Sequence, residues 1–154
     1  MNNQYRIRWM IRVDLPRVLE IEAANYACPW EEADFLESLR KNNQIGMVVE
    51  NSQDRVDAFM IYEPQKRVLR LIKIVVHPDH QRKGLGKLMI EKLKSKLRPD
   101  HRDKLRVVVD ETDLETLNFF KALGLRAKRV KWASRIEEPD QIVMVYHVSS
   151  DCPV

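Results

Sequence analysis

The sequence lacks the features that define several large classes of protein. Its 154 residues contain 2 cysteines, Cys28 and Cys152, and neither belongs to a CxxC pair or a Cys/His cluster. We therefore expect neither a disulfide framework nor a zinc site. No apolar run approaches the roughly 20 residues that cross a bilayer, and the opening residues MNNQYRIR lack the apolar stretch of a signal peptide. These absences predict a soluble, cytoplasmic protein.

The composition is that of a single folded domain. Apolar residues make up 44% of the chain, which is enough to cover a sheet with helices at this length. Because no repeat, low-complexity tract or linker is visible, we predict one domain over residues 1–150, followed by a short tail at 151–154. The four histidines are scattered along the chain, so no metal site is expected.

The positive charge is distributed unevenly. The formal net charge is only +4, yet residues 82–106 contain ten Lys or Arg residues against three acidic residues. Such a stretch indicates an anionic partner, either a phosphate-bearing cofactor or a nucleic acid. The plain alternative is a solvated helix face.

Hydrophobic periodicity and turn residues predict strands mixed with helices. Apolar and β-branched runs indicate strands at 5–11, 47–50, 56–62, 68–76, 105–109 and 142–148. Amphipathic spacing indicates helices at about 15–24, 31–41, 84–97 and 114–123. Asp14 is the predicted N-cap of the first helix. The expected order has two strands after the last helix, of which only the second is assigned residues, and 135–141 is expected as a flexible loop.

One segment carries a recognisable chemistry. A buried strand ending at Val76 runs through a His-Pro pair into a glycine-containing turn, and then directly into an amphipathic helix. Such a turn points backbone N–H groups outward, and the helix dipole adds about half a positive charge, so it attracts phosphate. Gly84 and Gly86 would let the backbone close around a pyrophosphate, because a Cβ would hold it away. The basic residues at its rim are Arg82, Lys83 and Lys87. The plain alternative is a tight turn that feeds a helix.

The glycine pattern is neither the P-loop GxxxxGK[ST] nor the dinucleotide fingerprint GxGxxG. The run Gln81-Arg82-Lys83-Gly84-Leu85-Gly86 instead resembles the Q/R-x-x-G-x-G/A signature of the GNAT superfamily of N-acetyltransferases. The preceding run at 74–79 resembles the strand of that family, and the run at 119–125 resembles its later YxxLGF element. The resemblance implies an α/β fold with a central mixed, mostly antiparallel sheet of about six or seven strands flanked by helices.

The same resemblance implies a cofactor, acetyl-coenzyme A, whose pyrophosphate the signature would hold. It implies that the strand before the signature splays from the strand at 104–109, which leaves backbone groups for the pantetheine. The N–H of Val76 would polarise the thioester carbonyl, and such a contact is typically worth about 2.7 to 4 kcal/mol in the transition state. The implied cofactor-binding residues are Ile74, Val75, Val76, Gln81, Arg82, Lys83, Gly84, Leu85, Gly86, Lys87 and Asp113.

Within the superfamily, Pro29-Trp30 and the chain length most resemble the ribosomal-protein alanine N-acetyltransferases, which acetylate the α-amino group of a protein. In that subfamily a glutamate is the general base and a tyrosine is the general acid. The matching positions here hold Val108 and Phe120, which cannot transfer a proton. We expect Asp110 or Glu111 to serve as the base instead, with capping of the following helix as the plain alternative.

Acetyl transfer remains chemically feasible without the two family residues. A peptide α-amine has a pKa near 7.7 to 8.0, so its neutral form at pH 7 costs about 1 kcal/mol, against roughly 4.6 kcal/mol for a lysine at 10.4. We therefore predict transfer to a primary amine, foremost a protein N-terminal α-amine. Glu20, Glu22 and Tyr26 either border the acceptor site or simply lie on the surface.

Three alternatives to this function stay open from the sequence. One is a transferase for a small amine, and another is a catalytically silent module that binds coenzyme A, as Val108 and Phe120 suggest. The third is a nucleic-acid binder, suggested by the basic stretch but unsupported by interleaved aromatic residues or a known motif. We expect no membrane partner, and contact with nucleic acid only indirectly, through a ribosomal substrate.

Overall fold

The computed structural model describes residues 4–41 and 43–148. The chain forms two compact units: unit 1 comprises Met1–Pro64 and Ile72–Lys92, and unit 2 comprises Gln65–Leu71 and Leu93–Val154. Strand β4 (Val68–Val76) runs through both. The sheet has seven strands in the order β1-β2-β3-β4-β5-β7-β6, so the predicted fold class is confirmed. The single-domain organisation stays a prediction, and the tail at 151–154 lies outside the described residues.

Unit 1 contains the antiparallel strands β1 (Arg6–Trp9), β2 (Ile45–Glu50) and β3 (Val56–Pro64). Strand β1 pairs with β2 in the register Arg6↔Glu50, and β2 pairs with β3 in the register Val48↔Phe59. The two predicted strands at 47–50 and 56–62 are confirmed, and they form an antiparallel hairpin. Its turn includes Asp54, which adopts a left-handed backbone with φ of 63°, a conformation that Asp and Asn tolerate better than most residues.

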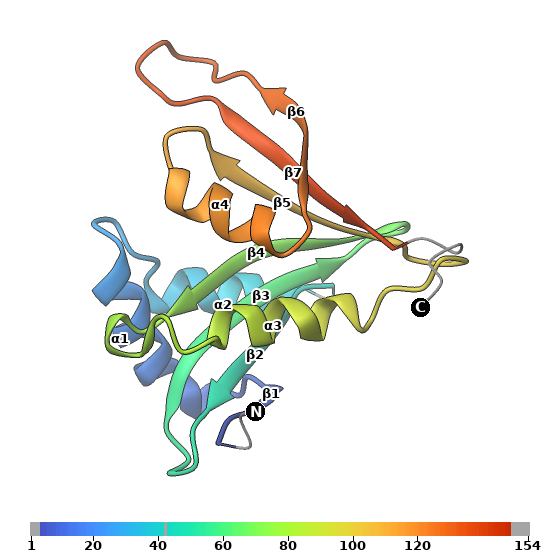
Figure 1. Ribbon diagram of the computed structural model, residues 1–154. Coiled ribbons are helices and arrows are strands. Elements are labelled where there is room, and N and C mark those ends of the chain that lie inside the picture. The colour runs from blue at the N-terminus through green and yellow to red at the C-terminus, as the bar shows by residue number, and fades with distance from the viewer. Residues whose placement is uncertain (1–3, 42, 149–154) are drawn as a thin grey trace. The chain divides into compact units, whose positions relative to one another are not determined.

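The helices of unit 1 are α1 (Leu15–Asn25), α2 (Glu32–Arg40) and α3 (Leu85–Lys94), of which residues 85–92 belong to this unit. Figure 1 shows α2 and α3 on opposite sides of the strands. Apolar residues of α1 and α2 pack with one face of β2 and β3 in a single core: Leu15, Val18, Ile21, Phe35, Val48, Val56, Phe59, Ile61 and Val75. Burial of each such side chain contributes about 1.5 to 3 kcal/mol, which fixes α1 and α2 on the sheet.

The start of α1 differs from the sequence prediction. Asp14 stands at the N-cap position after a 3-10 turn (Arg12–Asp14), but its side chain makes no capping hydrogen bond to α1. Its carboxylate instead accepts hydrogen bonds from the Arg8 guanidinium at 2.9 Å and from the Ile11 N–H at 2.8 Å. The predicted N-cap position is confirmed, but the carboxylate does not cap the helix, because charge-assisted bonds to an arginine satisfy a buried carboxylate better than one N–H does.

Unit 2 contains β5 (Lys104–Asp110), α4 (Leu114–Ala122), β6 (Arg126–Lys131) and β7 (Gln141–His147). Strand β5 pairs in parallel with the start of β4, in the register Val68↔Lys104, and antiparallel with β7. Its buried residues alternate at Leu105, Val107 and Val109, which places one face in the core. Gly124, with φ of 94°, ends α4 in a left-handed turn that a side chain would strain.

Most predicted elements are confirmed with shifts of a few residues, and β4 has its predicted bounds. The unassigned strand after the last helix is β6, whose residues RAKRVK are all exposed. Two 3-10 turns, Arg12–Asp14 and Pro78–His80, were not predicted. Among the described residues, no helix is long and apolar enough to cross a membrane.

Candidate functional site

The predicted phosphate-binding segment forms a strand, turn and helix corner in unit 1. Strand β4 ends at Val76, the turn at 77–84 follows, and α3 begins at Leu85. Val75 and Leu85 are buried and hold the two ends of the turn in the core. Residues 81–84 between them are exposed. The buried ends therefore present a short polar loop to the solvent.

The backbone of this loop is shaped to bind an anion. Arg82 and Gly84 both adopt left-handed conformations, with φ of 65° and 85°. Alternation of left-handed and right-handed residues turns successive N–H groups toward one point and forms an anion-binding nest. The N–H of Leu88 donates to the Gly84 carbonyl at 2.9 Å, which makes Gly84 the residue before the first helical turn. The N–H groups of residues 85–87 consequently have no acceptor within the helix.

A buried carboxylate anchors the base of the loop. Asp57 on β3 is 0% exposed. Its backbone carbonyl accepts a hydrogen bond from the His77 N–H at 2.9 Å. Its Oδ1 atom lies 3.4 Å from His80 Nε2 and 3.5 Å from an Arg17 nitrogen. The N–H of His80 donates to the His77 carbonyl at 2.8 Å. These contacts connect both ends of the turn at Pro78–His80 to one residue of the sheet.

The carbonyl of Val76 is held by two side-chain amides. Asn25 Nδ2, at the end of α1, lies 3.1 Å from this oxygen, and Gln81 Nε2 lies 3.3 Å from it. Gln81 Nε2 also lies 3.3 Å from Asn25 Oδ1. The side chain of Gln81 thus contacts the end of β4 in this structure. Sequence reasoning missed Asn25, because nothing in the local pattern of α1 marks it.

The loop fits a pyrophosphate. A Cβ added to Gly84 would meet no atom within 4 Å, so the space in front of the loop is open. Arg82, Lys83 and Lys87 are exposed around it and supply positive charge. Lys83 Nζ lies 3.4 Å from His80 Nδ1. An open nest with cationic side chains is the chemistry that binds phosphate oxygens.

The predicted catalytic acids lie in unit 2, where β5 ends and α4 begins. Asp110 and Glu111 are exposed, and Asp110 Oδ1 accepts a hydrogen bond from Gln141 Nε2 at 3.3 Å. Asp113 caps α4, because its Oδ1 accepts from the Thr116 N–H at 3.1 Å. The capping alternative therefore applies to Asp113. The roles of these three acids in catalysis or cofactor binding stay predictions.

The two positions that lack the family's proton-transfer residues are both in unit 2. Val108 lies on β5 and is partly buried, whereas Phe120 on α4 is 1% exposed. The Phe120 ring contacts Phe119 edge to face, with the ring centroids 5.1 Å apart. Phe120 is accordingly part of the core of unit 2. The predicted splay between the end of β4 and β5 involves residues of different units, and it stays a prediction.

Glu22 is not the surface residue that one alternative predicted. Its side chain is 1% exposed, and its Oε2 accepts from the Trp30 N–H at 3.0 Å and lies 2.9 Å from Lys73 Nζ. Lys73 Nζ also lies over the rings of Tyr26 and Trp30, at 4.8 and 4.6 Å from their centroids. Glu20, in contrast, is exposed at its side chain. The residues around Glu22 come from the α1–α2 region and from β4, so no local sequence pattern marks this site.

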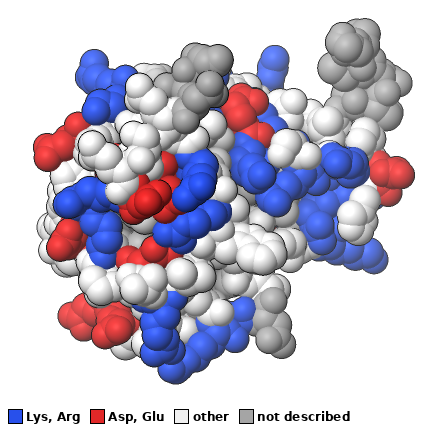
Figure 2. Space-filling model, turned by 90° about the horizontal axis from the view of Figure 1, so that it is seen from below, with Lys and Arg blue, Asp and Glu red and all other residues white. Residues whose placement is uncertain are grey.

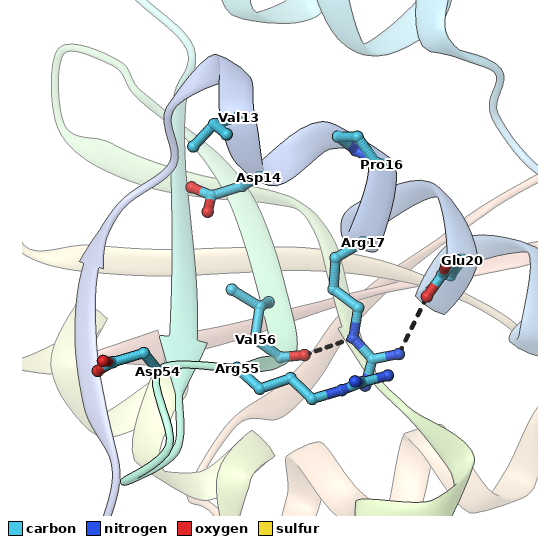
Figure 3. Close-up of a pocket in the computed structure, with 8 residues that line it drawn as sticks. All are labelled: Val13, Asp14, Pro16, Arg17, Glu20, Asp54, Arg55 and Val56. Carbon is cyan, nitrogen blue, oxygen red and sulfur yellow. Dashed lines mark hydrogen bonds and ion pairs between the residues drawn. The ribbon is translucent and has the colours of Figure 1, made fainter.

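A separate hollow of about 380 Å³ lies at the start of α1 and the β2–β3 turn. Figure 3 shows Arg17 crossing it, with hydrogen bonds to the Val56 carbonyl at 2.8 Å and to Glu20 at 3.2 Å. It contains none of the predicted catalytic or cofactor-binding residues, although Glu20, a candidate for the border of the acceptor site, lines it. Both signs of charge line it, because Asp54 and Arg55 lie at its rim. The hollow therefore offers no uniform field for an anionic cofactor.

The surface charges are mixed rather than uniformly basic. On the face shown in Figure 2, groups of Lys and Arg atoms are interrupted by Asp and Glu atoms. A continuous basic patch is the usual footprint of a nucleic-acid-binding surface, and the right side of this face carries a broader basic area with acidic atoms only at its edges.

The fold is an α/β sheet in which strand β4 runs through an exposed turn with two residues of positive φ into helix α3. The family model described as acetyltransferase (GNAT) family matches residues 7–125. The chain belongs to this family, and it is an N-acetyltransferase.

Individual relatives agree with this assignment. The [ribosomal protein bS18]-alanine N-acetyltransferase of Salmonella typhimurium is 26% identical over 139 residues, which cover 88% of this chain and 93% of the relative. The crystal structure of the ribosomal-protein-S18-alanine N-acetyltransferase from Escherichia coli has a TM-score of 0.80 at 24% identity and covers 94% of both chains. A spermidine N-acetyltransferase SpeG chimera from Vibrio cholerae and hSSAT has a TM-score of 0.76 at 20% identity and covers 94% of this chain and 96% of that one. These structures share the fold.

Proposed function

We propose that this N-acetyltransferase uses acetyl-coenzyme A and acetylates the α-amine of a protein N-terminus. The observation that carries the cofactor assignment is the loop at 81–84, with its left-handed Arg82 and Gly84 and its exposed basic side chains. Acetyl-coenzyme A would supply the acetyl thioester and a pyrophosphate that matches the nest. The residues that we assign to it are those of the β4 end and the loop, Ile74–Val76 and Gln81–Lys87, together with Asp113.

The acceptor assignment is supported by relatives whose names specify N-acetylation of an alanine of ribosomal protein bS18. It is also supported by the side chains at Val108 and Phe120, neither of which can accept a proton. An enzyme without a strong base suits an acceptor that is already partly neutral, and α-amines deprotonate near pH 8 whereas lysines do so near 10.4. An acceptor on a ribosomal protein would place the reaction in the cytoplasm.

Each residue has a distinct role in this proposal. The N–H of Val76 donates to the thioester carbonyl and stabilises the charge that develops on it. Asn25 and Gln81 position Val76, because their side-chain amides lie 3.1 and 3.3 Å from the Val76 carbonyl oxygen. Asp110 or Glu111 accepts the proton of the acceptor amine, directly or through a water molecule. The thiolate leaves without a side-chain acid, which is tolerable for a group with a pKa near 8.5.

Two other functions compete with this proposal. The spermidine N-acetyltransferase among the structural neighbours shares the fold, which makes a small amine the second acceptor class. A module that binds coenzyme A without turnover is the third, because Val108 and Phe120 replace the proton-transfer groups of the resembling subfamily. Both would retain the phosphate-binding loop.

The test is release of free thiol from acetyl-coenzyme A in the presence of N-terminal peptides, lysine peptides or small amines, with a blank that has no acceptor. We expect turnover with N-terminal peptides, and a fall of at least ten-fold when both Asp110 and Glu111 are replaced by Ala. Turnover only with small amines would refute the acceptor assignment. Tight binding of coenzyme A by calorimetry, without turnover on any acceptor, would instead support the silent module.

A further inference from the structure

The segment between α1 and α2 contains the three groups that proteins use to bind an organic ammonium ion. Glu22 supplies a buried carboxylate, and Tyr26 and Trp30 supply aromatic faces. A carboxylate combined with two rings is a typical site for such a cation, because the ring faces attract positive charge within about 6 Å of their centroids. All three belong to unit 1, and their arrangement does not depend on unit 2.

The occupant of this site is a side chain of the same protein. Lys73 Nζ lies 2.9 Å from Glu22 Oε2, 4.8 Å from the Tyr26 centroid and 4.6 Å from the Trp30 centroid. The Lys73 side chain is 14% exposed and the Glu22 side chain is 1% exposed, so the ion pair is largely removed from water. The Lys73 ammonium therefore occupies the site between the carboxylate and the two rings.

The carboxylate retains further capacity to accept hydrogen bonds. Glu22 Oε2 accepts from Lys73 and from the Trp30 N–H at 3.0 Å. Glu22 Oε1 is buried and has no hydrogen-bond partner among the residues that the structure describes. A buried acceptor without a donor is costly, and an ammonium ion carries three donors. Glu22 Oε1 can therefore accept a hydrogen bond that Lys73 does not supply.

The site lies beside the group that we assign to the thioester. Lys73 and Val76 are three residues apart on β4, which corresponds to about 10 Å along a strand. The same end of α1 reaches both residues, because Asn25 bonds the Val76 carbonyl at 3.1 Å and Glu22 bonds Lys73. An acceptor amine at Val76 would have its second substituent within reach of this site.

We propose that Glu22, Tyr26 and Trp30 form a binding site for a primary ammonium group, and that Lys73 fills it and so closes it to acceptors that carry a second ammonium. Lys73 is a specificity-determining residue in this view: it repels a diamine and leaves the reaction to acceptors with a single amine near the thioester. This consequence rests on the proposed function. The binding site itself does not, because it is defined by contacts within unit 1.

Replacement of Lys73 by Ala removes three carbons and the ammonium, which together correspond to propylammonium. We expect propylammonium chloride to raise the melting temperature of Lys73→Ala by about 3 to 6 °C at ten times its dissociation constant. Propan-1-ol has the same carbon chain without the charge, and should not do so. The wild-type protein and a variant of an exposed lysine, Lys66→Ala, should both shift by less than about 1 °C at the same salt concentration.

Further experiments test whether the added ammonium ion binds at Glu22. In Lys73→Ala combined with Glu22→Gln, the shift with propylammonium should disappear. If Lys73→Ala does not fold alone, its refolding yield with propylammonium or propan-1-ol replaces the melting experiment. Equal effects of the two additives, or equal shifts in Lys73→Ala and Lys66→Ala, would overturn the binding site.

The acetylation assay addresses specificity separately. Lys73→Ala should increase kcat/KM for a diamine relative to a monoamine of similar length by about ten-fold. An unchanged ratio would overturn the role of Lys73 in specificity and leave the ammonium site intact. Absence of all turnover in the wild type would contradict the proposed function, while the melting experiment would still decide the site.

Discussion

Gly84 offers the sharpest test of the phosphate-binding loop, because the chain contains a matched control. Gly84 and Gly124 both have positive φ, 85° and 94°. A Cβ at Gly84 meets nothing within 4 Å, and at Gly124 the nearest atom lies at 3.5 Å, an ordinary contact. Neither substitution creates a clash, so the cost of alanine at each is backbone strain of about 1 to 2 kcal/mol.

The two variants should consequently lose similar stability and differ in binding. At about 2 to 4 °C per kcal/mol for a chain of this length, each melting temperature should fall by roughly 2 to 8 °C. Only Gly84→Ala places a methyl group in the loop that faces the anion, so only it should weaken acetyl-coenzyme A binding, by at least ten-fold in calorimetry. Equal affinities of the two variants would refute the assignment of the loop to the cofactor.

Two further predictions concern side chains that hold the site and the fold. Asn25→Ala removes one donor to the Val76 carbonyl, worth about 1 kcal/mol, and steady-state kinetics should show kcat falling about five-fold with KM for acetyl-coenzyme A little changed; a change confined to KM would contradict a positioning role. Burial would raise the pKa of Asp14 and of Glu50, but hydrogen bonds outweigh it and hold both pKa values below their usual range. Arg8 donates to Asp14, whereas Glu50 accepts first from Arg6 and then from Arg8. The stability that these carboxylates contribute is therefore present above about pH 4 and is lost as the pH falls further. Arg8→Met should move the acid-unfolding midpoint, followed by circular dichroism, to higher pH, and an unchanged midpoint would show that Arg8 does not support the two acids.

The sequence predicted those elements whose local pattern and tertiary environment agree. Strand β4 was placed with its observed bounds, because an apolar run between turn residues is also what the core requires there. Strand β6 lacks that agreement: its residues are basic and exposed, and it forms because β7 offers hydrogen-bonding partners from Val145 to Gln141. A strand that owes its existence to pairing leaves little trace in its own residues.

The residues of the candidate site also differ in how far the sequence predicts them. The loop could be predicted because its chemistry is local: glycines, basic residues and a helix start within a few positions. Asn25, and the buried contact of Glu22 with Lys73, could not be predicted, because the partners Val76 and Lys73 lie far along the chain and no periodicity connects them. Asp113 shows a third case, in which capping competes with function for the same carboxylate.

The loop is held in shape by contacts with the rest of unit 1. Asp57 binds the His77 N–H and lies beside His80, and two amides hold the Val76 carbonyl where the loop leaves the strand. A loop ordered in this way avoids much of the entropy cost of closing around an anion, which otherwise subtracts from affinity. The position of Asp57 costs free energy of folding, since its Oδ1 is buried without a hydrogen bond among the described residues. Asp57 is the second residue of β3, and its carboxylate lies 3.4 Å from His80 and 3.5 Å from Arg17, so it contacts both the loop and α1.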